Sequence, residues 1–433
     1  MGEGQSVPRD DSDGIIFAGH DPAIFLNRGG KMNNAFLFDK GLLALMCWLV
    51  VGTAHAVANE TVAPVLHFGD LSVYPGLVFE LKHDSNIARE SDKNKISSVV
   101  SVLSPSVMLQ AEKDVYAYSF NYIADIGQYS KSSTDNYVDQ SFLGKAEIGL
   151  STRATLNIKP EYIIKHDDRG STYAITSEPN KWISRGVSGS LAYGAEEARG
   201  KVLFEAGHTD QQYQNNRTLT RDYDKTLIDL GSTFYLRVQP KTWVLAQAKQ
   251  KNISYKSATF SSLFQPALSS SEQRVMVGLK WEATAQSSGE IKIGQLQKKF
   301  DSATYSTSRS VSWAGLVSWT PLSFVNVNLF SSKEANETTL QGSSAILLSN
   351  TGADVAYTLN DRVSLHASGY QLKEVFLGSS RADTTDNFSM KAEYKFRPWL
   401  VGSAEYSNSA KTSNTAGNAY KRDILTLGVH SLL

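Results

Sequence analysis

Two short motifs contain a histidine next to an aspartate, the residue types that acid–base catalysis or metal binding would use. They are "HDS" at His83 and "HDDRG" at His166. A histidine beside a carboxylate can act as a general base or bind a metal ion. The remaining histidines are scattered without an H-x-x-x-H spacing, and no G-x-S-x-G motif accompanies them. We therefore expect no catalytic site, metal site or cofactor. The preferred interpretation is a solvated outer rim where strands enter loops, formed by His83, Asp84, Asn86, His166, Asp167, Asp168 and Arg169.

A larger set of polar residues alternates with apolar ones at a period of two. Between Arg153 and His166, for example, Leu156 and Ile158 alternate with Asn157 and Lys159. Successive side chains of a strand point to opposite faces, so this period predicts strands with one apolar and one polar face. The residues predicted on the polar face, as candidates to line a pore, are Glu80, Lys82, Ser119, Asn121, Asp125, Lys159, Glu161, Glu205, Asp229, Lys249, Lys280, Glu282, Asp354, Lys391 and Glu393.

About 18 such segments follow one another between residues 71 and 433. At roughly 9 to 15 residues they exceed the usual strand of a soluble protein and suit tilted strands that cross a bilayer. Segment 289–300, "EIKIGQLQKKF", alternates least clearly, so its register is the least certain. After the N-terminal region no run of about 18 apolar residues remains, which excludes a membrane protein built from spanning helices.

The connections between the segments alternate in length. Tight turns such as "AEKD", "LSTR" and "TPLS" alternate with longer polar stretches such as "DSNIARESDKNK" and "DDRGSTYAITSEPNK". A soluble sandwich or propeller has no reason to sort its connections in this way. The pattern predicts an all-β fold: a single antiparallel transmembrane β-barrel with short periplasmic turns and longer extracellular loops.

The N-terminal region has the features of an export signal. Lys40 precedes an apolar run that ends in Ala54-His55-Ala56, which predicts a signal peptide at residues 32–56 with Ala54 and Ala56 marking the cleavage site. Residues 1–31 are a polar prefix, so we expect Met32 to be the true start. The only cysteine, Cys47, lies inside the signal. Residues 57–70 then form a short periplasmic segment, and 71–433 form the barrel.

The charge balance and the C-terminus bear on location and partners. Lys and Arg total 43 against 43 for Asp and Glu, which leaves no basic surface of the kind that nucleic acid requires. The final stretch "DILTLGVHSLL" alternates to its end. Such a strand is typical of chains delivered to the barrel assembly machinery, although these usually end in Phe rather than Leu. We expect a protein of the Gram-negative outer membrane, in contact with its lipid.

The polar face has two possible roles in a barrel of this size. A lumen enclosed by about 18 strands is wide enough to hold water, so its charges can stay hydrated and pair across strands. They can brace the wall or select solutes. No stripe of a single sign is present, which disfavours a strongly ion-selective pore.

Several short motifs resemble a β-barrel porin family found beside exopolysaccharide and capsule gene clusters. They are "YPGLVFELKHDSNI", "YSFNYIADIGQYSKSSTDNYVDQ", "HDDRG" and "KFRPWL", and the resemblance covers nearly all of 70–433. It implies a non-enzymatic conduit or accessory barrel for an exported polysaccharide, which a periplasmic polysaccharide-export protein could deliver. A general diffusion porin, an outer-membrane barrel enzyme acting on lipid or surface glycan, and a passive structural or adhesive barrel remain the alternatives.

Overall fold

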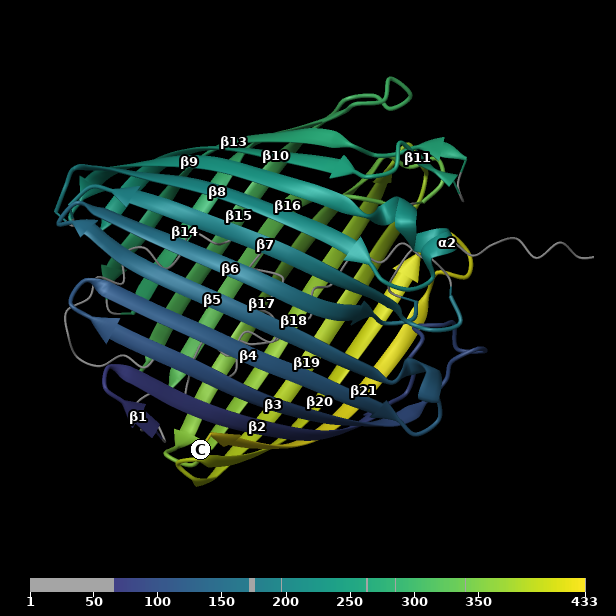
Figure 1. Cartoon of the computed structure of the whole chain (residues 1–433), viewed down its shortest axis with the longest axis horizontal. Helices are drawn as coiled ribbons and strands as arrows, with labels where there is room; N and C mark the ends of the chain where they lie inside the picture. The colour runs from purple at the N-terminus through teal and green to yellow at the C-terminus, as the bar shows by residue number, and fades with distance from the viewer. Residues whose placement is uncertain are drawn as a thin grey trace, which may run out of the picture.

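The computed structural model describes residues 66–170, 176–195, 197–261, 264–284, 286–338 and 340–432. The predicted prefix 1–31 and the cleavage residues Ala54 and Ala56 lie outside these residues. Strands dominate the described part and form one 19-stranded sheet (Figure 1). No helix in it is both long and apolar enough to cross a membrane.

Nine strands make up the first half of the barrel: β2 (Leu71–Asp84), β3 (Ser98–Lys113), β4 (Tyr116–Tyr129), β5 (Tyr137–Ser151), β6 (Ala154–Asp167), β7 (Asn180–Tyr193), β8 (Gly200–Tyr213), β9 (Lys225–Gln239) and β10 (Thr242–Tyr255). The second half consists of β13 (Ser270–Thr284), β14 (Ser287–Phe300), β15 (Ser308–Leu322), β16 (Val325–Asn336), β17 (Ala345–Asn360), β18 (Val363–Leu377), β19 (Ala382–Arg397), β20 (Leu400–Ser413) and β21 (Tyr420–Leu432).

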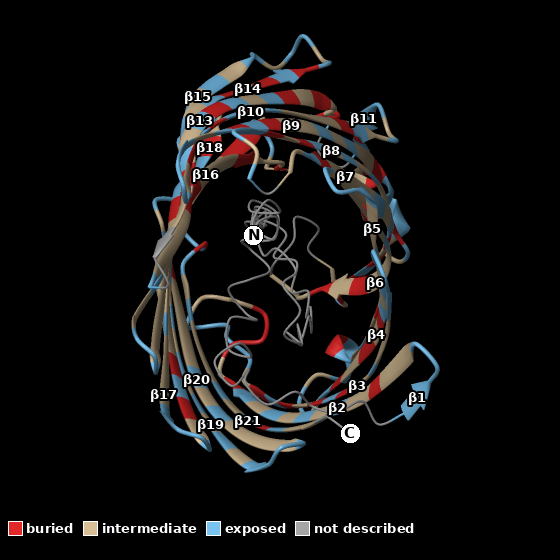
Figure 2. Ribbon diagram, turned by 90° about the vertical axis from the view of Figure 1, so that its left-hand side faces the viewer, coloured by how far each residue is buried: buried red, intermediate tan, exposed pale blue. Residues whose placement is uncertain are grey.

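The barrel closes between its first and last strands. Each strand pairs antiparallel with its neighbour in the chain, and β2 pairs with β21 from Gly76 opposite Leu432 to Asp84 opposite Ile424. Seen along its axis, the wall forms an oval ring (Figure 2). The pairing of β2 with β21 confirms the predicted closed antiparallel barrel of about 18 strands. Closure leaves no unpaired strand edge in the wall.

Three short strands lie outside the ring. β1 (Leu66–Phe68) falls in the predicted periplasmic segment and pairs with the start of β2. β11 (Thr259–Phe260) and β12 (Gln265–Pro266) pair with each other in the connection between β10 and β13. None of them alters the closure of the barrel.

The two ends of the barrel differ in their connections. One end, here called the turn side, has turns as short as 114–115, 152–153 and 240–241. The other, the loop side, has connections such as 85–97, 168–179 and 256–269. Only the connection 378–381 is tight on the loop side, because β18 ends at Leu377 and β19 begins at Ala382.

The outer face of the wall is apolar. On β4 the side chains of Tyr116, Tyr118 and Phe120 are 43%, 47% and 40% exposed, while the alternating Ser119 and Asn121 are less exposed. On the other strands too, large apolar side chains are exposed at alternate residues, for example Phe79 on β2 and Phe388 on β19. In a membrane barrel these positions meet lipid.

Segment 289–300 has the register that its sequence left uncertain. It forms β14, which pairs along its length with β13 and β15. Ile291 and Ile293 take outward positions and are 49% and 57% exposed. Gln295, Gln297 and Lys299 continue on the same outward face toward the loop side. The alternation was weak because the outer face itself turns polar at this height.

Candidate functional site

The inner wall carries ion pairs formed within single strands. Glu80 and Lys82 on β2 approach to 2.9 Å, and Lys391 and Glu393 on β19 to 2.6 Å. Residues two apart in a strand share a face, so this spacing places both partners in the lumen. Lys280 and Glu282 on β13 repeat the arrangement at 3.4 Å. Each cation is thus compensated by an anion beside it.

One pair spans a strand instead of following it. Lys249 Nζ on β10 lies 2.9 Å from Glu205 Oε2 on β8, although β9 runs between them. Gly231 on β9 is the residue paired with both. A Cβ at Gly231 would lie 3.1 Å from the Glu205 carboxylate, so the missing side chain leaves the space in which the pair meets.

The other predicted lining residues occupy inner positions on β4, β6, β9 and β17. Asp125 on β4 accepts a hydrogen bond of 2.6 Å from Ser104 on β3. The structure does not gather these residues into one site; it distributes them around the wall. Those on other inner positions are Ser119, Asn121, Lys159, Glu161, Asp229 and Asp354.

Sequence reasoning missed three pairs of the same kind. Lys145 and Glu147 on β5 lie 3.0 Å apart, and Glu290 and Lys292 on β14 lie 2.6 Å apart. The third, Glu272 and Arg274 on β13, lies 2.9 Å apart at the loop side. All have the spacing of two that the predicted pairs have, so opposite charges at i and i+2 were the signal available in the sequence.

At the loop side, the predicted rim residues Asp84 and Asn86 hold the closure of the barrel. Arg422 on β21 donates to Asp84 on β2: its Nη2 and Nε lie 2.6 and 3.0 Å from Oδ2, and Nε lies 3.2 Å from Oδ1. Asn86 is fully buried and donates to the carbonyls of Glu90 and Lys421. Loop 85–97 is thereby fixed against the last strand.

The "HDDRG" motif connects three loops. His166 Nδ1 lies 2.9 Å from Asp139, and its Nε2 lies 3.5 Å from Asp168. Arg169 donates to both carboxylate oxygens of Asp135 at 2.6 and 2.5 Å. Both ring nitrogens of His166 thus meet carboxylates, which leaves neither to activate a nucleophile.

The rest of the motif is equally engaged. Asp167 accepts a 2.8 Å hydrogen bond from Trp182 Nε1, and Arg89 of loop 85–97 lies 3.3 Å from Asp168. Burial favours a higher pKa for Asp168, but His166 and the nearby arginines outweigh it and hold that pKa well below its usual range. His83 lies apart, exposed on the outward face of β2.

A second set of loops is fixed on the opposite part of the mouth. Glu337, after β16, forms an ion pair with Lys225 at the start of β9, and Lys298 Nζ on β14 lies 3.9 Å from it. Burial favours a higher pKa for Glu337, but Lys225, Lys298 and Lys251 lower it to about 2. The loop that follows β16 is therefore held against β9 and β14, which lie five and two strands away from β16 in the sheet.

An apolar cluster packs beside this ion pair. Phe260, Leu268, Phe300 and Ala345 are buried together, and Tyr305 donates a 2.8 Å hydrogen bond to the carbonyl of Pro266. The cluster joins the connections 256–269 and 301–307 to the start of β17. Several loop segments accordingly lie inside the outline of the ring in Figure 2.

A third buried charge cluster explains the short connection 378–381. Arg381 donates to Oδ1 of Asp383 at 3.2 Å and to Oδ2 at 2.7 Å, and Lys411 on β20 lies 3.1 Å from the same carboxylate. All three residues are at most 4% exposed. Burying Asp383 between two cations requires β19 to extend to this height, which the sequence pattern did not indicate.

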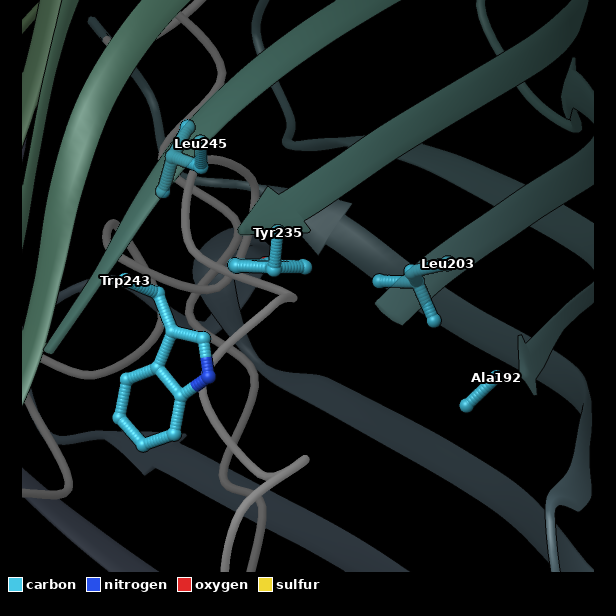
Figure 3. Close-up of a cluster of buried hydrophobic side chains, with 5 residues drawn as sticks. All are labelled: Ala192, Leu203, Tyr235, Trp243 and Leu245. Carbon is cyan, nitrogen blue, oxygen red and sulfur yellow. The ribbon is translucent and has the colours of Figure 1, made fainter. Parts of the chain in front are cut away.

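One part of the inner wall is apolar. Ala192, Leu203, Tyr235, Trp243 and Leu245 come from the turn-side ends of four adjacent strands, β7 to β10 (Figure 3). Lys201, Arg237 and Lys280 place their cationic groups 5.5 to 5.9 Å from the Trp243 ring. Paired charges line both halves of the lumen, and this aromatic surface lies at its turn side.

A family model matches residues 66–431 of the chain, and its description is "Putative beta-barrel porin 2". That range runs from β1 through β21 and omits only the last residue of that strand. The chain belongs to this porin family. The porin is therefore an outer-membrane β-barrel protein of a Gram-negative bacterium, as its sequence predicted.

The solved structures that match the chain are distant in sequence. OpdK of Pseudomonas aeruginosa with vanillate is 10% identical, with a TM-score of 0.49 over 83% of this chain and 99% of that one. OccK9 (OpdG) of the same species is 11% identical, with a TM-score of 0.49 over 84% and 99%. A BenF-like porin of Pseudomonas fluorescens Pf-5 is 11% identical, with a TM-score of 0.47 over 84% and 99%. No curated protein matches the chain.

Proposed function

We propose that this porin is a diffusion channel for small polar solutes, which was the alternative to polysaccharide export in the sequence interpretation. The observation that supports it is the fixed state of the loop-side mouth. Buried ion pairs such as Asp84–Arg422 and Lys225–Glu337 anchor the loops to the wall. Loops held in this way narrow the opening permanently and do not need a partner to move them.

The inner wall suits weak, unselective passage. Its ion pairs are neutral overall, so a solute meets alternating donors and acceptors and no attractive field of one sign. Transport requires binding that is weak enough to permit release. Hydroxyl-rich or zwitterionic solutes of low mass fit this wall best.

Liposome swelling tests the proposal. Full-length mature porin in phospholipid vesicles is expected to admit arabinose and glucose, to admit a disaccharide more slowly and to exclude dextran. Vesicles with heat-denatured porin are the control. Swelling no faster than in that control would contradict a constitutively open channel.

Export of an exopolysaccharide or capsular polysaccharide is the second candidate. The same neutral wall, with hydroxyl and amide groups such as Ser119 and Asn121, suits a weakly charged glycan that must slide without binding tightly. This reading requires a periplasmic polysaccharide-export protein as a partner. Deleting the gene should then abolish surface polysaccharide, and normal amounts of it would contradict the role.

A further inference from the structure

Four cations on the outward face of the barrel have no ion-pair partner among the described residues. They are Lys299 on β14, Arg309 on β15, Lys333 on β16 and Lys373 on β18. Their neighbours in sequence show the contrast: Lys298 and Glu374 point inward and are at most 1% exposed, within ion-paired clusters. The inner charges are compensated, and these outer charges are not.

The parity of the strands places these four residues on the lipid-facing side. Lys299 is six residues after Ile293 and Arg309 is two residues before Val311, and residues an even number apart in a strand share a face. Ile293 and Val311 are 57% and 55% exposed on the outer face. Lys373 shares its face with Val375, which is 47% exposed. All four therefore lie on the same surface as the apolar band, toward its loop-side edge.

An aromatic side chain marks that edge. Trp313 on β15 faces outward beside Val311, donates a 2.9 Å hydrogen bond to Ser331, and has Lys333 Nζ 5.4 Å from its ring centre. Aromatic residues of membrane barrels gather where the hydrocarbon meets the head groups. Lys333 thus lies at the depth of the head groups.

The four cations are arranged over five consecutive strands. Lys333 pairs with Ser349 on β17, which pairs with Lys373 on β18, so the two lysines flank one serine at about 10 Å from each other. The other outward residues at this height on β14 to β18 are Gln295, Gln297, Ser331, Ser349, Thr351 and Gln371. None of these is acidic. The acids that border the surface are Asp301, exposed just after β14, and Asp386 on β19, which accepts a 2.7 Å hydrogen bond from Gln371, so the cations outnumber them by four to two.

We propose that this surface, Lys299, Arg309, Lys333 and Lys373, binds the phosphate groups of a phosphorylated glycolipid in the outer leaflet. The occupant is a lipid and not a free anion because the cations border the apolar band, so one molecule can place its acyl chains on Ile293 and Val311 and its phosphates on the lysines. Each Lys or Arg near a membrane surface contributes about 1 kcal/mol of attraction to anionic lipid.

The opposite wall provides a matched comparison. Lys181 and Arg185 also face outward near the loop side, on β7. There Arg185 is paired in register with Asp210 on β8, an acid on the same outward face, which in turn bonds to Lys256 at 2.7 Å. Neutralising these two cations changes the outer charge by the same amount as neutralising Lys333 and Lys373.

Binding is measured on the full mature porin in a non-ionic detergent, by native mass spectrometry with bisphosphorylated lipid A. The fourfold variant Lys299→Gln, Arg309→Gln, Lys333→Gln and Lys373→Gln should bind at least about tenfold more weakly. Lys333→Gln with Lys373→Gln should bind more weakly than the parent, and Lys181→Gln with Arg185→Gln should stay within twofold of it. An unchanged far-ultraviolet circular dichroism spectrum shows that the variants keep the barrel intact.

Two further arms identify the source of the phosphate. Dephosphorylated lipid A and phosphatidylglycerol should bind at least about tenfold more weakly than bisphosphorylated lipid A. Inorganic phosphate, added at 10 mM as the concentration chosen for this experiment, should not displace bound lipid A. Equal binding of dephosphorylated lipid A, parent-like binding by the fourfold variant, or displacement by free phosphate would each overturn the proposal. These outcomes do not depend on whether the lumen conducts solutes.

Discussion

Single residues at the loop-side mouth decide how firmly the barrel is closed. Asp84 and Arg422 are far apart in sequence yet meet where β2 and β21 join, with the Asp84 carboxylate 5% exposed. A buried ion pair adds little over an apolar pair, but removal of one partner leaves a buried charge uncompensated. The seam therefore depends on both residues being present.

Asp84→Asn tests this dependence. The change leaves the Arg422 guanidinium without its anion, so the free energy of unfolding should fall by about 3 kcal/mol or more. Urea unfolding in phospholipid vesicles, followed by tryptophan fluorescence, measures it. Lys95→Gln is the control, because its pair with Asp92 is 48% and 64% exposed and should contribute about 0.5 kcal/mol or less.

Glu337 gives the mouth a defined response to acid. Its pKa of about 2 lies below the usual value near 4.3, so its contribution is complete above about pH 4.3 and is lost as the pH falls through about 2. Pepsin should cleave the loop after β16 slowly at pH 4 and faster near pH 2, with fragments identified by mass spectrometry. Glu337→Gln should lack this step, and fast cleavage of the parent already at pH 4 would contradict the assignment.

At the scale of elements, each strand of the wall has one face toward lipid and one face toward the water-filled lumen. On β4, Phe120 is 40% exposed on the outer face, and Ser119 next to it takes an inner position. The period of two made this separation readable from sequence for nearly every strand. It was least clear at 289–300, where Gln295 and Gln297 occupy outward positions near the head groups and the alternation in hydrophobicity ends before the strand does.

A pair of lysine substitutions on β4 tests the separation. Phe120→Lys places a charge in lipid and should lower the free energy of unfolding by about 2 kcal/mol or more, whereas Ser119→Lys faces the lumen and should cost much less. Urea unfolding in vesicles gives the first quantity. Only Ser119→Lys should alter the ion selectivity of the pore, and equal destabilisation by both changes would argue against the assigned faces.

For the whole molecule, the balance of charge along the lumen sets the behaviour of the pore. Pairs such as Glu80–Lys82 and Lys391–Glu393 compensate each other locally, which removes any long-range field of one sign. We expect a reversal potential near zero in a KCl gradient. A channel of this type responds to solute size more than to solute charge.

Glu80→Gln with Glu393→Gln should convert this channel into an anion-preferring one. The change removes two negative charges from beside Lys82 and Lys391 and leaves the lumen more positive, so the reversal potential across a planar bilayer should shift toward that of chloride. Glu80→Gln with Lys82→Gln removes a neutral pair and serves as the control, with no shift expected. A parent-like potential in the first variant would show that these residues do not line the conducting path.

The sequence by itself determined the barrel, its strands and the face that each side chain takes, because these follow from a local period of two and from the sorting of turns by length. It also contained the ion pairs at i and i+2. Only the tertiary structure decided which distant charges meet, since Asp84 and Arg422 are separated by 338 residues and Lys225 and Glu337 by 112. Closure of the ring sets these contacts, and no periodicity along the chain records where the ring closes.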